Sequence, residues 1–230
     1  RNGGNQMFDI SGWTGGHDDL ITRGNGVVDM PEKLYVFAER FWPRKAHWSF
    51  YANMRYAADG LRGWRHGGLS AYLEPAYSVN DRLTFNVGLE LVNNPDWLLW
   101  QGDVQRLGTY GRKQVFMNAG ATWLIDDRQE LRVRLEALGL DAEAKQSWAV
   151  APDGTPVRSA TPVSSFAVRN LGFQVRYRYE FAPLSYLYLA YVRGGSLFDN
   201  VDGEYSARDE FTDAFDLRDS EQLLVKLSYR

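Results

Sequence analysis

Segment 170–193 constrains the fold most strongly, because residues 173–181 within it alternate strictly between two kinds of side chain. Apolar and aromatic residues occupy every second position from Phe173 to Phe181, and polar or charged residues fill the positions between them. Side chains two apart share a face of a β-strand, so one face is aromatic and the other is charged. A proline-containing interruption at residues 182–185 precedes a second strand-like run at Tyr186. The segment therefore predicts a β-hairpin with a tight turn.

Ten such strand segments are expected along the chain, and their connections alternate in length. The expected strands are 5–14, 34–42, 46–58, 69–79, 82–92, 113–125, 128–140, 170–181, 186–192 and 222–230. Short turns at 43–45, 80–81, 126–127 and 182–185 alternate with longer connections at 15–33, 59–68, 93–112, 141–163 and 194–220. Bacterial outer-membrane barrels have this asymmetry, with short periplasmic turns and long extracellular loops.

The overall composition is compatible with a membrane barrel. No run approaches the roughly eighteen apolar residues of a membrane helix, so the chain would cross a bilayer only with strands of about nine to eleven residues. A mean hydropathy of −0.42 does not argue against a membrane barrel, because each lipid-facing residue of such a strand is followed by a polar one. Trp and Tyr near strand ends suit a membrane interface. We predict an all-β, antiparallel transmembrane β-barrel of about ten strands, or the C-terminal part of a larger barrel, as one domain over residues 1–230.

Several function classes lack support in the sequence. The chain has no cysteine, which excludes disulfides, thiolate metal sites and a cysteine nucleophile. A net charge of −3 provides no basic footprint for nucleic acid. The start at Arg1, without Met or a signal-peptide pattern, indicates a processed chain or a fragment.

Two acidic loop regions are weak site candidates. His17, Asp18 and Asp19 suggest a metal site or an outer-membrane protease, but they lack a second, separated ligand pair, so a solvated loop is the favoured interpretation. The loop at 194–220 is rich in carboxylates but its spacing matches no calcium loop, which favours a mobile acidic surface loop. No G-x-S-x-G pattern is present. We therefore predict no catalytic residue, no metal site and no cofactor.

Charged residues that alternate with apolar ones along the strands are the better candidates. They are expected to line the lumen, as a pairing network that fills the barrel or as a polar path for a solute. The predicted lumen-lining residues are Arg55, Glu74, Glu90, Arg132, Arg134, Glu136, Arg176, Arg178 and Glu180.

Four segments, 18–26, 109–138, 165–194 and 222–230, resemble an uncharacterised bacterial family. Its members carry a carbohydrate-binding, family-nine-like domain at the N-terminus and an outer-membrane barrel at the C-terminus, and only the barrel part is similar to this chain. The most specific similarity is the series Arg169-Asn170, Arg178-Tyr179-Glu180, Pro183 and Ser185 to Leu189. This chain reads Arg-Gly-Asn-Gly at 23–26, where the family tends to have Arg-Gly-Gly-Pro. The resemblance transfers no catalytic residue, and sugar binding by the N-terminal domain does not transfer either.

Together these features predict a non-enzymatic barrel in the outer membrane of a Gram-negative bacterium, a porin-like channel or an anchor and translocation module, with a carbohydrate-related role implied by the resemblance. Its expected partners are membrane lipid and lipopolysaccharide, with saccharide as a candidate solute. Two alternatives stay open: an outer-membrane hydrolase with its site in the extracellular loops, and a secreted sugar-binding β-sandwich.

Overall fold

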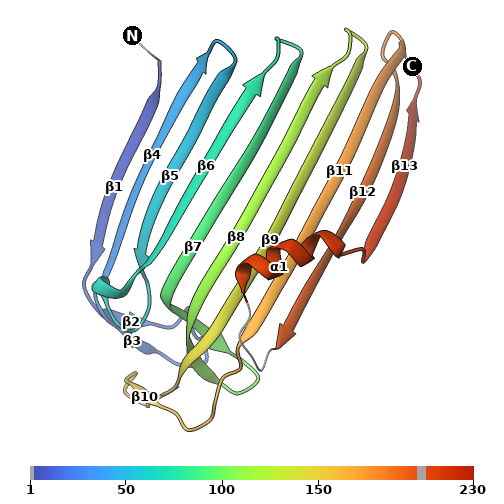
Figure 1. Cartoon of the computed structure of the whole chain (residues 1–230). Coiled ribbons are helices and arrows are strands. Elements are labelled where there is room, and N and C mark those ends of the chain that lie inside the picture. Colours follow the sequence, from blue (N-terminus) through green and yellow to red (C-terminus); the bar gives the residue numbers. More distant parts are fainter. Residues whose placement is uncertain (1–2, 201–205) are drawn as a thin grey trace.

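The computed structural model describes residues 3–200 and 206–230, in which β-strands dominate (Figure 1). One antiparallel sheet contains eleven strands, and ten of them follow one another across it in chain order. These ten are β1 (Asn5–Trp13), β4 (Lys33–Lys45), β5 (Trp48–Ala58), β6 (Gly68–Ser78), β7 (Leu83–Gln101), β8 (Arg106–Leu124), β9 (Gln129–Val150), β11 (Phe166–Ala182), β12 (Ser185–Asn200) and β13 (Ser220–Ser228). The eleventh, β10 (Pro156–Arg158), pairs with β9. The prediction of an all-β, antiparallel chain is confirmed.

The remaining elements are small. Strands β2 (Gly16–Asp18) and β3 (Val28–Met30) form a separate two-stranded sheet. The helical elements are η1 (Trp64–His66), α1 (Ala207–Asp213) and η2 (Ala214–Asp216). No helix in the described residues is long and apolar enough to span a bilayer.

The large sheet is open. Its edges are β1 and β13, which do not pair with each other. They run in opposite directions, and in Figure 1 the start of β1 and the end of β13 lie at the end of the sheet where the short turns are. The observed architecture is a single long sheet rather than the two packed sheets of a β-sandwich.

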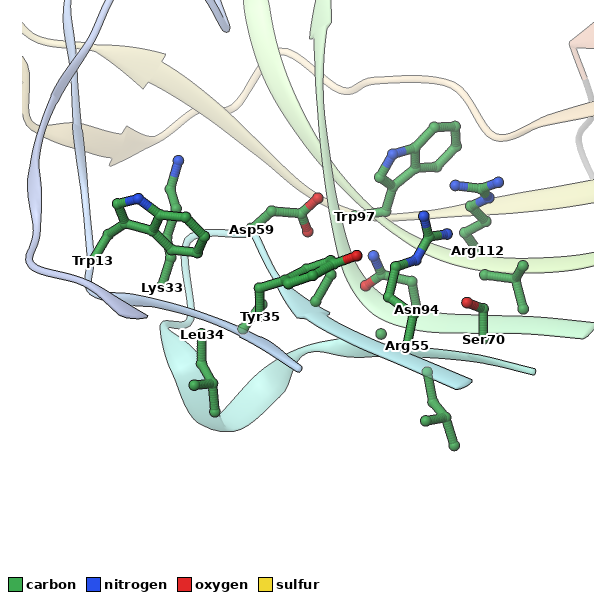
Figure 2. A pocket seen from close by; sticks show the side chains of 15 residues that line it. Trp13, Lys33, Leu34, Tyr35, Arg55, Asp59, Ser70, Asn94, Trp97 and Arg112 are labelled. Atoms are coloured by element: carbon green, nitrogen blue, oxygen red, sulfur yellow. The ribbon is translucent and has the colours of Figure 1, made fainter. Parts of the chain in front are cut away.

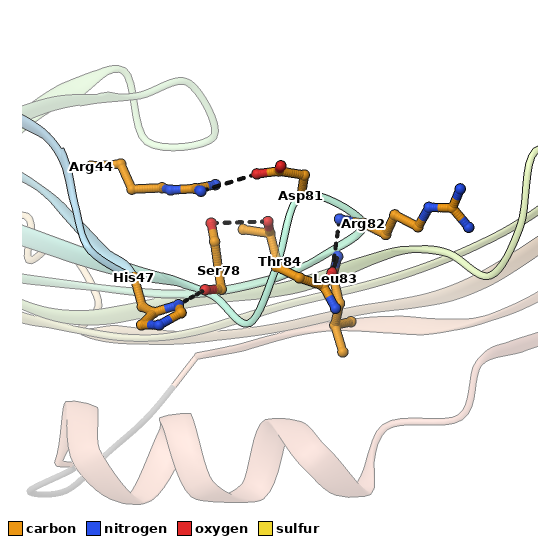
Figure 3. Close-up of polar contacts among 8 residues, drawn as sticks. Arg44, His47, Ser78, Asp81, Arg82, Leu83 and Thr84 are labelled. Carbon is orange, nitrogen blue, oxygen red and sulfur yellow. Dashed lines mark hydrogen bonds and ion pairs between the residues drawn. The ribbon is translucent and has the colours of Figure 1, made fainter.

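Four short turns join neighbouring strands at this end of the sheet, close to the predicted positions. Two of them are linked by an ion pair between Arg44 Nη2 and Asp81 Oδ1 (3.0 Å; Figure 3), and a second pair of the same length joins Arg82 to Asp127 in the next turn. In that turn Asp126 accepts a hydrogen bond from the backbone N–H of Arg128 (2.8 Å), which lowers the pKa of the Asp126 carboxyl. These pairs are exposed, so their contribution to stability is small.

The first short turn lies later than predicted. Pro43 belongs to β4, and the chain reverses at Ala46 and His47, with Ala46 at a positive φ of 55°. A register irregularity between Trp42 and Lys45 accommodates the proline, which has no N–H to donate.

Three strands in the middle of the sheet are longer than the sequence pattern predicts. The expected connection at 93–112 is mostly strand, because β7 continues to Gln101 and β8 begins at Arg106. The β7–β8 pairing has a register irregularity between Asn94 and Trp97, which accommodates Pro95, and the pairing continues beyond it. In the same way β9 continues to Val150, well into the expected connection at 141–163.

The two faces of the sheet differ in chemistry, and the apolar one is the more exposed. Cross-strand register places Phe85, Val87, Leu89 and Leu91 of β7 on what we call the apolar face. Leu89 and Leu91 are 42% and 52% exposed, and Leu73 of β6 on the same face is 52% exposed. On the opposite, polar face, Ser70, Gln114 and Glu130 are only 4–8% exposed. A soluble protein is expected to bury its apolar face, so this distribution is inverted.

The connection between β1 and β4 reaches strands far across the sheet. Val28 and Met30 of β3 form a buried apolar cluster with Leu98 of β7 and Leu107 of β8. The backbone N–H of Asp29 donates to the carbonyl of Gly154, after β9 (2.8 Å). One end of the sheet is therefore bridged by its own loops, at the end opposite the short turns.

The segment before β13 is docked on the apolar face rather than being a mobile loop. Helix α1 packs against β9 where Gly139 leaves room for it, since a Cβ at this position would lie 2.2 Å from the backbone nitrogen of Phe211. Of the expected loop 194–220, residues 194–200 belong to β12 and residues 207–216 form α1 and η2, while residues 201–205 lie outside the described part of the chain.

Candidate functional site

All nine predicted lumen-lining residues lie on the polar face of the sheet. Cross-strand register relates them: Arg55 pairs with Ser70, Glu90 with Tyr72, and Glu136 with Asn118. Arg132 is directly opposite Arg176, and Arg178 is opposite Glu130. The nine do not form one cluster. Glu74 and Glu90, together with Glu39 of β4, lie in an acidic region on β4–β7 that also contains Arg55, and the other six lie in an arginine-rich region on β9 and β11.

The acidic region is a hydrogen-bonded network. Tyr72 donates to Glu74, and the side-chain amide of Asn118 also donates to this carboxylate (2.8 Å). A similar contact joins Tyr51 to Glu39 of β4 (2.7 Å). Tyrosines and an amide therefore stabilise these carboxylates, and neither carboxylate forms an ion pair with an arginine of the described residues.

The arginine-rich region has few acidic partners. Glu130 contacts both Arg132 and Arg178, the latter at 3.3 Å between Nη2 and Oε2. Arg134 and Arg176 form no ion pair in the part of the chain that the structure describes. Glu130 was not predicted from the sequence. It is the second residue of β9, next to the turn, where the alternating pattern only begins. Glu180 accepts a hydrogen bond from the backbone N–H of Leu184 (3.0 Å) and so closes the β11–β12 turn.

A pocket of about 440 Å³ opens on the polar face, near the end bridged by loops (Figure 2). Two arginines, Arg55 of β5 and Arg112 of β8, point into it. Its aromatic lining residues are Trp13, Tyr35 and Trp97. The guanidinium of Arg112 lies over the ring of Trp97, 4.7 Å from its centroid. Of these residues only Arg55 was predicted, because the others lie in an expected loop or in strands whose faces are ambiguous from the sequence.

Aromatic side chains gather on the apolar face beside the short turns. Trp48 stacks on Phe50 at 5.9 Å and contacts Tyr77 at 4.8 Å between ring centroids. Trp42 and Trp123 lie on the same face at the same end of their strands. The result is an aromatic row along one margin of the apolar face.

Two arginines lie on the apolar face at its opposite margin, and the segment 206–219 covers both. Arg169 binds Glu210 of α1 through two hydrogen bonds (2.5 and 3.2 Å) and lies 3.3 Å from Asp213. Arg193 donates to the carbonyls of Phe215 (2.7 Å) and Leu217 (3.1 Å). Carboxylates therefore neutralise the guanidinium of Arg169, and backbone carbonyls accept hydrogen bonds from that of Arg193, although both groups lie on the apolar face.

The loop candidates form structural contacts. His17 Nδ1 pairs with Asp29 across the small β2–β3 sheet. Asp18 accepts backbone hydrogen bonds from Leu20 and Ile21 (2.9 and 3.2 Å) and thus holds the turn that follows it. In residues 3–200 and 206–230, no group of three or more His, Asp or Glu side chains is arranged to hold a metal ion.

Comparisons with protein families, with curated proteins and with solved structures found no match to this chain.

Proposed function

We propose that this chain forms a β-barrel in the outer membrane of a Gram-negative bacterium and acts as a passage for polar solutes rather than as an enzyme. The observation that carries the proposal is the inverted sheet: the exposed face is apolar and the protected face is polar. Lipid is the solvent that stabilises an exposed Leu, Val and Phe surface, and water in a lumen suits the polar face.

The height of the apolar face fits a bilayer. On β7 it extends from Leu83 to Leu91. Eight steps of about 3.4 Å give roughly 27 Å along the strand, or about 20 Å across the membrane at a tilt of about 40°. Outer-membrane barrels have an apolar band of about 25 Å.

The margins of the apolar face fit the same proposal. Trp42, Trp48, Tyr77 and Trp123 suit an interfacial girdle on the short-turn, periplasmic side. The docked segment 206–219, with its paired arginines, suits the headgroup level on the other side, where lipopolysaccharide would be its neighbour.

Barrel closure is part of the proposal. Both edge strands continue the apolar face, through Phe8 and Ile10 of β1 and Leu223, Val225 and Leu227 of β13. In the described residues, the backbone groups along the outer side of each edge strand have no partner strand, which is costly in lipid. They close the barrel by pairing antiparallel with each other or with further strands of a larger barrel, and in both cases the apolar face stays outward.

Passage through the lumen can be measured in liposomes. We expect the reconstituted protein to raise ion permeability, and we expect the combined change of Arg132, Arg134, Arg176 and Arg178 to Gln to move the reversal potential toward cation selectivity. The reason is that a cluster of positive charge disfavours cations in a narrow polar path. Changing the exposed turn arginines Arg44 and Arg82 to Gln is the control, and it should leave selectivity unchanged.

An unchanged ion permeability would have a different meaning. If permeability stays at background in both proteins and the four changes lower stability, the polar face is a sealed network and the barrel is an anchor. Hydrolysis of peptide or lipid that depends on His17 or Asp18 would instead support the outer-membrane hydrolase alternative.

A further inference from the structure

We propose that the pocket between Arg55 and Arg112 binds a carboxylated saccharide. The proposal rests on the proposed function for its location, at the loop-side mouth of the lumen, and it adds the chemical class of the solute. Binding is measured in detergent without transport, so a failure of this proposal is distinguishable from a failure of the channel.

The first observation is the proximity of two positive charges, Arg55 and Arg112, in one pocket. Neither Arg55 nor Arg112 forms a direct ion pair in the described ranges, although Glu90 and Asp59 lie close enough to Arg112 to attract its charge. The Arg112 Nε atom is buried and has no hydrogen-bond partner in the same part of the chain. Two guanidinium groups that share a pocket repel each other, and a bound anion removes that repulsion.

The second observation is the orientation of Arg112. Its guanidinium is held over Trp97, and one of its Nη atoms binds Gln114. A guanidinium fixed in this way is preorganised, and its planar set of N–H donors matches the two oxygens of a carboxylate.

The third observation is that the rest of the lining suits a sugar ring. Trp13 is 54% exposed, so its ring face is accessible. Figure 2 shows Tyr35 between Trp13 and Arg55, with Asp59 and Asn94 nearby. Aromatic rings pack against the C–H face of a pyranose, while a carboxylate and an amide accept and donate hydrogen bonds to its hydroxyls. A volume of about 440 Å³ lies within the range of small-molecule sites.

Lys33 and Asp59 refine the expected pose. Lys33 also lines the pocket, but its amine lies 3.6 Å from Asp18, so it is already paired. The carboxylate of the ligand is therefore expected at the Arg55 and Arg112 end, and its neutral ring at the Trp13 end, where Asp59 would repel a second negative charge.

The test is a matched pair of disaccharides, cellobiouronate and cellobiose, which differ only in one carboxylate. We expect cellobiouronate to quench the tryptophan fluorescence of the detergent-solubilised protein saturably. Cellobiose should bind at least about tenfold more weakly, because it cannot form the charge-assisted bidentate contact with an arginine. Arg55→Gln and Arg112→Gln should each weaken cellobiouronate binding by about tenfold or more. Arg112→Lys, which keeps the charge but loses the planar donors, should give an intermediate affinity.

Arg65→Gln is the control, because it removes the same charge from an exposed position at the same end of the sheet and outside the pocket. Thermal unfolding of each variant establishes that it is folded. Absence of saturable cellobiouronate binding to the folded protein overturns the proposal, as does equal weakening by Arg65→Gln. Equal affinity for cellobiouronate and inorganic sulfate would overturn the saccharide assignment and leave only an anion site.

Discussion

Val175→Arg is expected to lower the free energy of unfolding in lipid bilayers by about 2–4 kcal/mol. Val175 lies on the apolar face in the middle of the β11 stripe, between Phe173 and Tyr177. An arginine near the midplane of the bilayer loses hydration without gaining a partner, which is the physical reason for the cost. Equilibrium folding titrations into liposomes of defined thickness measure this change.

Val192→Arg on the neighbouring strand is the matched control. Val192 lies opposite Gln174 on the polar face, so the same substitution there places the new charge among polar groups. We expect a much smaller change in the free energy of unfolding. A neutral Val175→Arg together with a costly Val192→Arg would reverse the assignment of the two faces.

Glu210→Ala is expected to destabilise the protein by about 3 kcal/mol, the lower part of the range for breaking a buried ion pair. The Glu210 side chain is 2% exposed and that of Arg169 is 23% exposed, so removing the carboxylate takes away the buried bidentate partner of this guanidinium, which keeps its contact with the more exposed Asp213. The helix α1 should then detach, and proteolysis within 206–219 should accelerate. Chemical denaturation and limited proteolysis of the reconstituted protein measure both effects.

Asp209→Ala separates this contact from a general effect on helix charge. Asp209 is the neighbouring, exposed acid of the same helix. Its loss should change stability by less than about 1 kcal/mol, the size of a helix-dipole effect. Equal effects of the two substitutions would mean that the Arg169 contact does not hold α1 on the sheet.

The strand order and the faces could be predicted from sequence because both depend on local information. Alternation with period two assigns each residue to a face, and tight turns at residues such as Asn80 and Asp126 set which strands pair. The residues assigned to the polar face by alternation, from Arg55 to Glu180, lie on one face of the observed sheet. Only their placement on that face is observed, and their role in a lumen stays a prediction.

The features that sequence reasoning missed depend on long-range or irregular geometry. Pro95 marks a loop in the sequence, but a bulge absorbs it and the β7–β8 hairpin continues. That error placed Arg112 in a loop and hid the pocket that it forms with Arg55. Helix α1 has seven residues, which are too few to show a helical periodicity in the sequence. Its buried Glu210 cannot be told apart in the sequence from the other acidic residues of this segment.

In the proposed barrel, the exposed apolar face of this sheet contacts lipid while the polar face contacts water. Because the chain has no cysteine, single-cysteine variants from Leu83 to Val92 accept one spin label each. In liposomes, we predict collisions with oxygen at positions 85, 87, 89 and 91 and collisions with a water-soluble nickel chelate at 84, 86 and 90. Uniform access of the nickel chelate to all these positions, or the opposite parity, would contradict the membrane barrel.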